Sequence, residues 1–230
     1  MQRLRLTFTK TAAMRYTGHL DLHTTWERTL RRARLPLAYS QGFHPHPKIQ
    51  LAAALPLGFT SECELADVWL ETPHALADLR ARLDTAAPPG MHLHAIEEVP
   101  EVGPTLQTLV RSSEYRVTIV SAFSVEALEE RIAQLLAAPS LPRVRKEKPY
   151  DLRPLIESLG RVASDELGHT LHMRLSAREG ATGRPEEVVE ALGHSAAEAR
   201  FHRLRLLFAD SSQTLKQNRE EHQAHQDVSS

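Results

Sequence analysis

The sequence predicts an α+β protein made of two ferredoxin-like halves, each with the element order βαββαβ and an antiparallel sheet, arranged in tandem. Three observations support this prediction. Short segments of alternating apolar residues are typical of half-buried strands. Segments with apolar residues every three or four positions indicate amphipathic helices. The order of these segments before residue 100 repeats after residue 112, although no residue-level repeat relates the halves.

The first half is predicted over residues 1–100. Leu4, Leu6 and Phe8 alternate as in a half-buried strand. Thr72 is expected to cap a helix whose first residue is Pro73. The expected elements are a strand over 3–9, a helix over 19–34, strands over 48–54 and 64–71, a helix over 73–83 and a strand over 91–99.

A connector containing Pro and Gly, residues 101–112, leads to a second half over 113–210. Ser124 is expected to cap its first helix, and the stretch 150–159 is ambiguous. The polar residues 211–230 are expected to be disordered. The other expected elements are a strand over 114–121, a helix over 125–135, strands over 142–148 and 171–176, a helix over 185–192 and a strand over 201–208.

The composition excludes some classes of protein. There is no run of eighteen apolar residues, so no transmembrane helix is expected. Cys63 is the only cysteine, so an intramolecular disulfide is excluded. A reducing, cytoplasmic location is therefore expected.

The near-neutral net charge of −1 hides an asymmetry along the chain. Residues 1–50 hold nine Lys or Arg against two acidic residues, whereas residues 51–110 hold two Arg against nine acidic residues. One interpretation is an anionic ligand bound at a single basic face. The other is that the two segments neutralise each other across a shared sheet.

The residues that could carry chemistry gather in the first fifty positions. Arg28, Arg31 and Arg32 fall on one helical ridge, and the stiff loop before Lys48 carries Tyr39 and Phe43. Cations that bind phosphates, together with aromatic rings on which bases stack, are typical of RNA recognition. The candidate RNA or ligand residues are Arg28, Arg31, Arg32, Phe43, Lys48, His19, His23, His44, His46 and Tyr39. The alternative is a solvated helix face with Phe43 and Tyr39 in the core.

The histidines allow a second interpretation. His44 and His46 form an H-x-H pair, and His19 and His23 share a helix face that Asp21 could join. A transition metal such as zinc or iron could bind this set, but no metal is assigned because no complete ligand motif is present. A second basic segment, 143–148, could extend a groove between the halves, or protect an edge strand by its charge.

Several of these residues lie in five motifs, which are F-T-K-x-x-x-M-R-Y-x-G-H-L-D-L, R-x-L-R-R-A-x-L-P, Y-S-Q-G-F-H-P-H-P-K-I, A-L-P-L-G and K-x-K-x-Y-D-L-R-P. In these motifs the chain resembles the uncharacterised radical SAM-associated (radical SAM-linked) protein family. Gly18 stands where the family usually has Ser. The resemblance implies a partner, a radical SAM protein encoded beside or fused to family members, and a role in RNA or ribosome metabolism.

An iron–sulfur cluster of the radical SAM type needs three cysteine ligands, and this chain has one. The cluster and S-adenosylmethionine are therefore expected on the partner, with no cofactor in this chain. The leading hypothesis is a non-catalytic protein that binds RNA, tRNA or rRNA, or presents a substrate to the radical SAM enzyme. The alternatives are a His-dependent or metal-dependent RNA-processing enzyme centred on His44 and His46, and a scaffold that only docks the partner.

Overall fold

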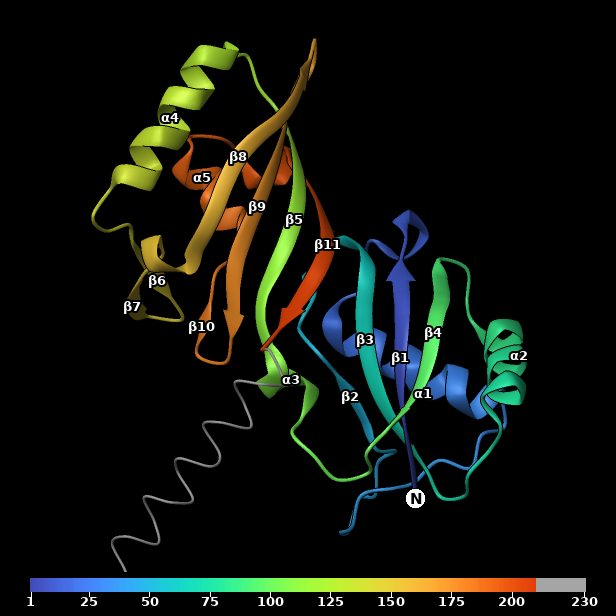
Figure 1. Cartoon of the computed structure of the whole chain (residues 1–230). Helices are drawn as coiled ribbons and strands as arrows, with labels where there is room; N and C mark the ends of the chain where they lie inside the picture. Colours follow the sequence, from blue (N-terminus) through green and yellow to red (C-terminus); the bar gives the residue numbers. More distant parts are fainter. Residues whose placement is uncertain (210–230) are drawn as a thin grey trace, which may run out of the picture.

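The structure is a computed structural model that describes residues 1–209. In the first hundred residues, four strands and two α-helices follow the order βαββαβ. The elements are β1 (Gln2–Lys10), α1 (His19–Arg32), β2 (Ile49–Leu51), β3 (Thr60–Leu70), α2 (Leu76–Ala86) and β4 (Met91–Val99). Their strands are ordered β2-β3-β1-β4, and every neighbouring pair is antiparallel. Figure 1 shows both helices on the same face of these strands.

The second part of the chain has a similar order with additional short strands. It contains α3 (Leu106–Leu109), β5 (Val110–Val120), α4 (Val125–Ala137), β6 (Pro142–Arg145), β7 (Lys148–Asp151), β8 (Ile156–Asp165), β9 (Gly168–Arg178), β10 (Ala181–Thr182), α5 (Pro185–Ala191) and β11 (Arg200–Phe208). The main strands are ordered β8-β9-β5-β11, again with antiparallel neighbours. The strands β6 and β7 form a separate hairpin.

All the larger strands belong to one nine-stranded, mostly antiparallel sheet, so the fold is mixed α+β. The two parts join where β11 runs parallel to the start of β3, pairing His202 with Thr60 and Arg203 with Ser61. Further along, β3 pairs with β2 instead, from Ala66 to Val68. One strand of the first part therefore meets both β11 and β2, and β11, the last strand among the described residues, lies at the centre of the sheet (Figure 1).

Each part has its own apolar core. Phe8 and Trp26 meet edge to face, with their ring centroids 4.9 Å apart, in the core between β1 and α1. Val117 and Leu171 are buried in the core of the second part. Ser124 caps α4 as the sequence predicts, by accepting a hydrogen bond from the backbone of Ala127. No helix among residues 1–209 is long and apolar enough to cross a membrane.

Some predicted elements are wrong. Thr72 caps no helix, because α2 begins at Leu76 after Ala75. The side chain of Gln2 accepts a hydrogen bond from the His74 backbone N–H at 3.0 Å and donates to the His74 carbonyl at 3.1 Å. This contact ties the segment before α2 to β1, so the segment does not join the helix. Helix propensity depends on local sequence and does not include such a long-range contact.

Other differences concern the second part. The predicted strand over 142–148 is the hairpin of β6 and β7, which turns at Lys146 and Glu147, both in the left-handed region. The ambiguous stretch 150–159 contains the start of β8, which pairs along most of its length with β9. The predicted connector holds the short helix α3. The predicted disordered tail lies outside the described residues.

Candidate functional site

The predicted arginine ridge lies on the solvent-facing side of α1. Arg28, Arg31 and Arg32 are all exposed, and the last two lie in the final turn of the helix. Cations there interact favourably with the negative end of the helix dipole. None of the three forms an ion pair with a carboxylate of residues 1–209.

Contacts between its two ends close the predicted loop before Lys48. Tyr39 bridges to Pro47, and the Ser40 hydroxyl accepts a hydrogen bond from the His46 backbone N–H at 3.0 Å. His44 and His46 are exposed. Phe43 is 102% exposed, so the interpretation that places it in the core is wrong. Tyr39 is 40% exposed and is not a core residue either. Lys48 is half-buried.

The predicted histidines do not form one cluster. His19 begins α1 and is half-buried, whereas His23 lies beside Glu27, with Nδ1 and Oε1 4.0 Å apart. Asp21 is exposed. In the part of the chain that the structure describes, no three His, Cys, Asp or Glu side chains are grouped so that they could hold a metal ion. The metal site that the sequence allows is therefore not present as a ready-made set of ligands.

The charge asymmetry is only partly neutralised within the sheet. Arg3 and Arg5 both pair with the buried Asp67, at 2.6 and 2.9 Å, so neutralisation across the sheet is confirmed for these two cations, and the anionic ligand stays a prediction. The other exposed or half-buried cations of residues 1–50 form no ion pair with a carboxylate of the described residues. They are Arg15, Arg28, Arg31, Arg32, Arg34 and Lys48.

A buried ion pair joins the two parts of the sheet. Arg203 on β11 donates from Nη1 to both carboxylate oxygens of Glu64 on β3, at 2.9 and 3.0 Å, and from Nη2 to the Tyr115 hydroxyl at 3.2 Å. Burial lowers the pKa of Arg203, but Glu64 and Tyr115 outweigh burial and hold that pKa above its ordinary value.

Lys10 completes this charged centre. Its ammonium donates to the Phe59 carbonyl at 2.9 Å, and the side chain has no exposed surface. Burial lowers the pKa of Lys10 to about 8, Glu64 opposes this shift, and Arg203 adds to it. One carboxylate is therefore close to two buried cations.

A cavity of about 640 Å³ opens beside this centre, and we call it the junction cleft. It is lined by the segments 52–56 and 182–186 and by side chains from both parts of the sheet, among them His19, Ser113, Tyr115, Arg145 and Arg203. His19 is the one predicted ligand-binding residue that lines it. Burial lowers the pKa of His19, so the imidazole stays neutral at pH 7.

The junction cleft gathers buried polar atoms that have no hydrogen-bond partner. Among residues 1–209 there are eight such atoms, and five belong to residues that line this cleft. They are His19 Nδ1, Ser113 Oγ, Arg145 Nε, Glu186 Oε2 and Arg203 Nε. Each buried, unpaired polar group costs about 1–3 kcal/mol. Such a concentration is typical of a site that a polar ligand or ordered water completes.

Two of these residues are positioned by the hairpin and by α5. Arg145 donates from Nη2 to the Tyr150 hydroxyl and to Glu187, each at 2.8 Å, and its guanidinium stacks 4.5 Å from the Tyr150 ring centroid. Burial, followed by the Glu187 carboxylate, raises the pKa of Tyr150 to about 12. Burial raises the pKa of Glu186 as well.

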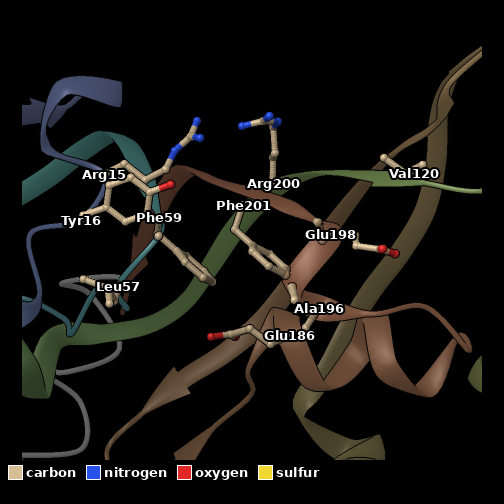
Figure 2. A pocket seen from close by; sticks show the side chains of 13 residues that line it. Arg15, Tyr16, Leu57, Phe59, Val120, Glu186, Ala196, Glu198, Arg200 and Phe201 are labelled. Carbon is tan, nitrogen blue, oxygen red and sulfur yellow. The ribbon is translucent and has the colours of Figure 1, made fainter.

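A second cavity, of about 610 Å³, lies at the same junction, and we call it the rim pocket (Figure 2). Phe59 and Phe201 stack across the junction with centroids 4.6 Å apart. Figure 2 shows the guanidinium groups of Arg15 and Arg200 on the same side of this pocket, above the two rings. Tyr16, 79% exposed, also lines it, so the pocket combines cations with an accessible aromatic ring.

Cys63 is a poor candidate for a nucleophile or a metal ligand. The thiol is half-buried on β3, and burial, together with Glu64, raises the pKa of Cys63 to about 11. The thiolate is the reactive and ligating form of cysteine. Cys63 therefore stays protonated, and unreactive, at neutral pH.

The fold and the cleft define a mixed α+β protein with a ligand-sized cavity where two parts of one sheet meet. The chain belongs to the family described as "Uncharacterized protein conserved in bacteria (DUF2344)", whose profile matches residues 3–185. A comparison with curated proteins gives no match.

The fold is similar to that of one solved structure at very low sequence identity. A chain in "Crystal Structure of a Cbf5-Nop10-Gar1 Complex" aligns with a TM-score of 0.52 and 8% identity, over 88% of this chain and 48% of that one. A chain of the archaeal box H/ACA sRNP Nop10-Cbf5 complex aligns with a TM-score of 0.44 and 10% identity, over 88% and 47%. This chain therefore spans about half the length of these two solved chains.

Proposed function

We propose that this protein is a non-catalytic RNA-binding accessory protein that presents RNA to a separate radical SAM enzyme. The observation that carries the RNA part is Phe43, a phenyl ring wholly in solvent at a loop stiffened by Pro45 and Pro47. An exposed aromatic ring on a pre-ordered loop is suited to stack on a base.

Electrostatics support the same proposal. The arginine ridge of α1 consists of exposed cations without carboxylate partners in the described residues. The half-buried Arg15 and the exposed Arg200 add two more cations at the rim pocket, one from each part of the chain. RNA binding that rests on such cations releases counterions, and it therefore weakens steeply as salt increases.

The strand order supports an interpretation of the fold as two ferredoxin-like units. In each part, the first strand lies between the third and the fourth, and the second strand lies outside the third. We infer that residues 1–100 and 113–208 are two βαββαβ units fused into one sheet through β11 and β3, with the β6–β7 hairpin and β10 as additions to the second.

The radical SAM partnership rests on the resemblance of the sequence motifs. The chain has one cysteine, and a radical SAM cluster needs three cysteine ligands. The cluster, S-adenosylmethionine and the chemistry would belong to the partner. Co-purification of the untagged protein from its native cells would identify a cluster-bearing protein. Recovery of the chain without any such protein would remove this part of the proposal.

RNA binding is tested by salt-dependent fluorescence anisotropy with tRNA and single-stranded rRNA fragments. Replacing Arg28, Arg31 and Arg32 by Ala removes three phosphate contacts. The slope of log K against log salt should therefore become shallower by about 2, at roughly 0.7 per contact for single strands. Phe43→Ala should weaken binding by about 1–3 kcal/mol without changing the salt slope.

The matched control is a triple Ala variant of Arg111, Arg116 and Arg205, which are exposed on β5 and β11. It removes the same charge from the other part of the sheet, and it should leave the salt slope as in the wild type. Equal effects of the two triple variants would mean that any positive charge suffices, and the assignment of the site to α1 would be wrong. Absence of binding at low salt would refute the RNA proposal itself.

A further inference from the structure

The junction cleft and the exposed arginine ridge require different ligands. The ridge offers unpaired positive charge, whereas the cleft has no excess of positive charge. Arg203 is paired with Glu64, and Arg145 with Glu187. Among the other lining residues, the carboxylates Glu179 and Glu186 outnumber Arg184. His19 is neutral at pH 7, because burial lowers its pKa. The interior of the cleft is therefore not suited to a phosphate group, although it is strongly polar.

The unpartnered atoms define the hydrogen bonds that an occupant would make. The Nε atoms of Arg145 and Arg203 can only donate, so the occupant must present acceptors. Glu186 Oε2 is an unpartnered carboxyl oxygen, and it calls for a donor when ionised. Ser113 Oγ can do both, and the role of His19 Nδ1 depends on its tautomer. The occupant must therefore be an uncharged group that carries donors and acceptors together.

The phosphate of RNA is charged, which leaves the ribose and the nucleobase, both of which carry donors and acceptors. The ribose is part of the strand, whereas a nucleobase can leave the stack and enter a pocket with the donors and acceptors of its edge. The volume of about 640 Å³ lies within the range of sites that enclose a small ligand. The exposed Arg184 lines the same cleft and is suited to the phosphate that would remain outside.

We propose that the junction cleft receives a single nucleobase, extruded from the bound RNA, and reads its edge through Ser113, Arg145 and Glu186. This inference rests on the proposed RNA binding and deepens it, because it names the part of the RNA that enters the protein. A base that is bulged or single-stranded is the preferred occupant, since little stacking energy is lost when it leaves the helix.

Ser113 offers a clean test, because it has a matched control next to it. Ser113 is 1% exposed with an unpartnered hydroxyl, so Ser113→Ala removes a polar group without breaking any hydrogen bond of the free protein. Ser112 lies on the opposite face of β5, and its hydroxyl donates to Glu157 at 2.7 Å. Ser112→Ala therefore breaks a hydrogen bond outside the cleft. Circular dichroism and thermal unfolding establish that both variants are folded.

The experiment uses a short RNA hairpin with one bulged 2-aminopurine, a base whose fluorescence rises when it leaves the stack. Anisotropy of a terminal dye reports RNA binding, and 2-aminopurine fluorescence reports entry of the base. We expect the wild type and Ser112→Ala to raise the 2-aminopurine signal, and Ser113→Ala to weaken the interaction that produces it about tenfold. RNA that binds with an unchanged 2-aminopurine signal, or with the same signal in Ser113→Ala, overturns the inference and leaves RNA binding intact.

A second experiment uses free nucleosides. It distinguishes a cleft that binds a base within RNA from a cleft that binds a free nucleoside. Saturation-transfer NMR with the four ribonucleosides tests the cleft without any phosphate backbone. If RNA fails to bind but a nucleoside binds and Ser113→Ala abolishes that binding, the RNA proposal fails while the cleft remains a nucleobase site for free nucleosides. If neither the RNA base nor any nucleoside responds to Ser113→Ala, the cleft holds ordered water only and the inference is wrong.

Discussion

Replacing Glu64 by Gln tests whether the buried ion pair holds the two parts of the sheet together. Glu64 is 2% exposed, and it is the carboxylate that Arg203 contacts with both Nη1 hydrogen bonds. Gln keeps the shape but removes the charge, so Arg203 and Lys10 remain as buried cations without a counterion. Breaking a buried pair by removing one partner costs about 3–5 kcal/mol.

Lys10 limits that loss, because it can release its proton. Its pKa is about 8 in the native protein, so deprotonation at pH 7 costs about 1.4 kcal/mol. Glu64 raises this pKa, and its removal makes deprotonation easier still. We therefore expect the free energy of unfolding at pH 7 to fall by an amount near the lower limit, about 3 kcal/mol.

The assay is urea unfolding followed by circular dichroism, and the control is Glu62→Gln. Glu62 lies two residues earlier on the same strand and contacts His202 on β11 at 2.9 Å, but its side chain is 56% exposed. An exposed pair of this kind contributes at most about 1 kcal/mol. If Glu64→Gln loses no more stability than Glu62→Gln, the buried pair does not determine the stability of the junction, and the reasoning is refuted.

Three further predictions concern single residues. The pKa of Lys10 falls from 10.5 to about 8 on folding, so the unfolded chain binds more protons between these values. Between pH 8 and pH 10.5, the free energy of unfolding of the wild type should therefore rise by up to about 3 kcal/mol relative to that of Lys10→Met. Urea unfolding measures both proteins, and an equal pH dependence of the two would contradict this. Cys63, with a pKa of about 11, should react with iodoacetamide at pH 8 at least about tenfold more slowly than in urea, and equal rates would contradict its burial. Ser124→Ala should lower the thermal stability by about 1 kcal/mol, whereas Thr72→Ala, which removes no cap, should not.

The sequence predicts elements best where a local pattern determines them. The strand β1 and the helix α1 lie within two residues of their expected bounds, because apolar periodicity and Pro36 mark them locally. The strand β8 was not predicted, because Ile156–Asp165 lacks regular alternation and owes its conformation to pairing with β9. Long-range pairing of this kind leaves little trace in the segment itself.

The candidate site was predictable only in part, for a similar reason. The motifs of the first quarter predict a site at the loop and the ridge. The junction cleft, in contrast, is formed by residues from several separate segments, none of which carries a recognisable motif at those positions. One signal was available. Lys10 and Glu64 each occupy the apolar phase of an alternating strand, where a charged side chain is unusual. Charged residues at such positions indicate a buried polar centre.

The position of β11 at the centre of the sheet has a consequence for biosynthesis. While a ribosome is making the chain, the flanking strands β3 and β5 emerge long before the strand that lies between them. Until Arg200–Phe208 leaves the exit tunnel, the nascent polypeptide presents two unpaired strand borders to the solvent. Stalled or truncated translation products that stop short of this segment should therefore be prone to aggregation and need chaperones, even though most of the molecule has already been made.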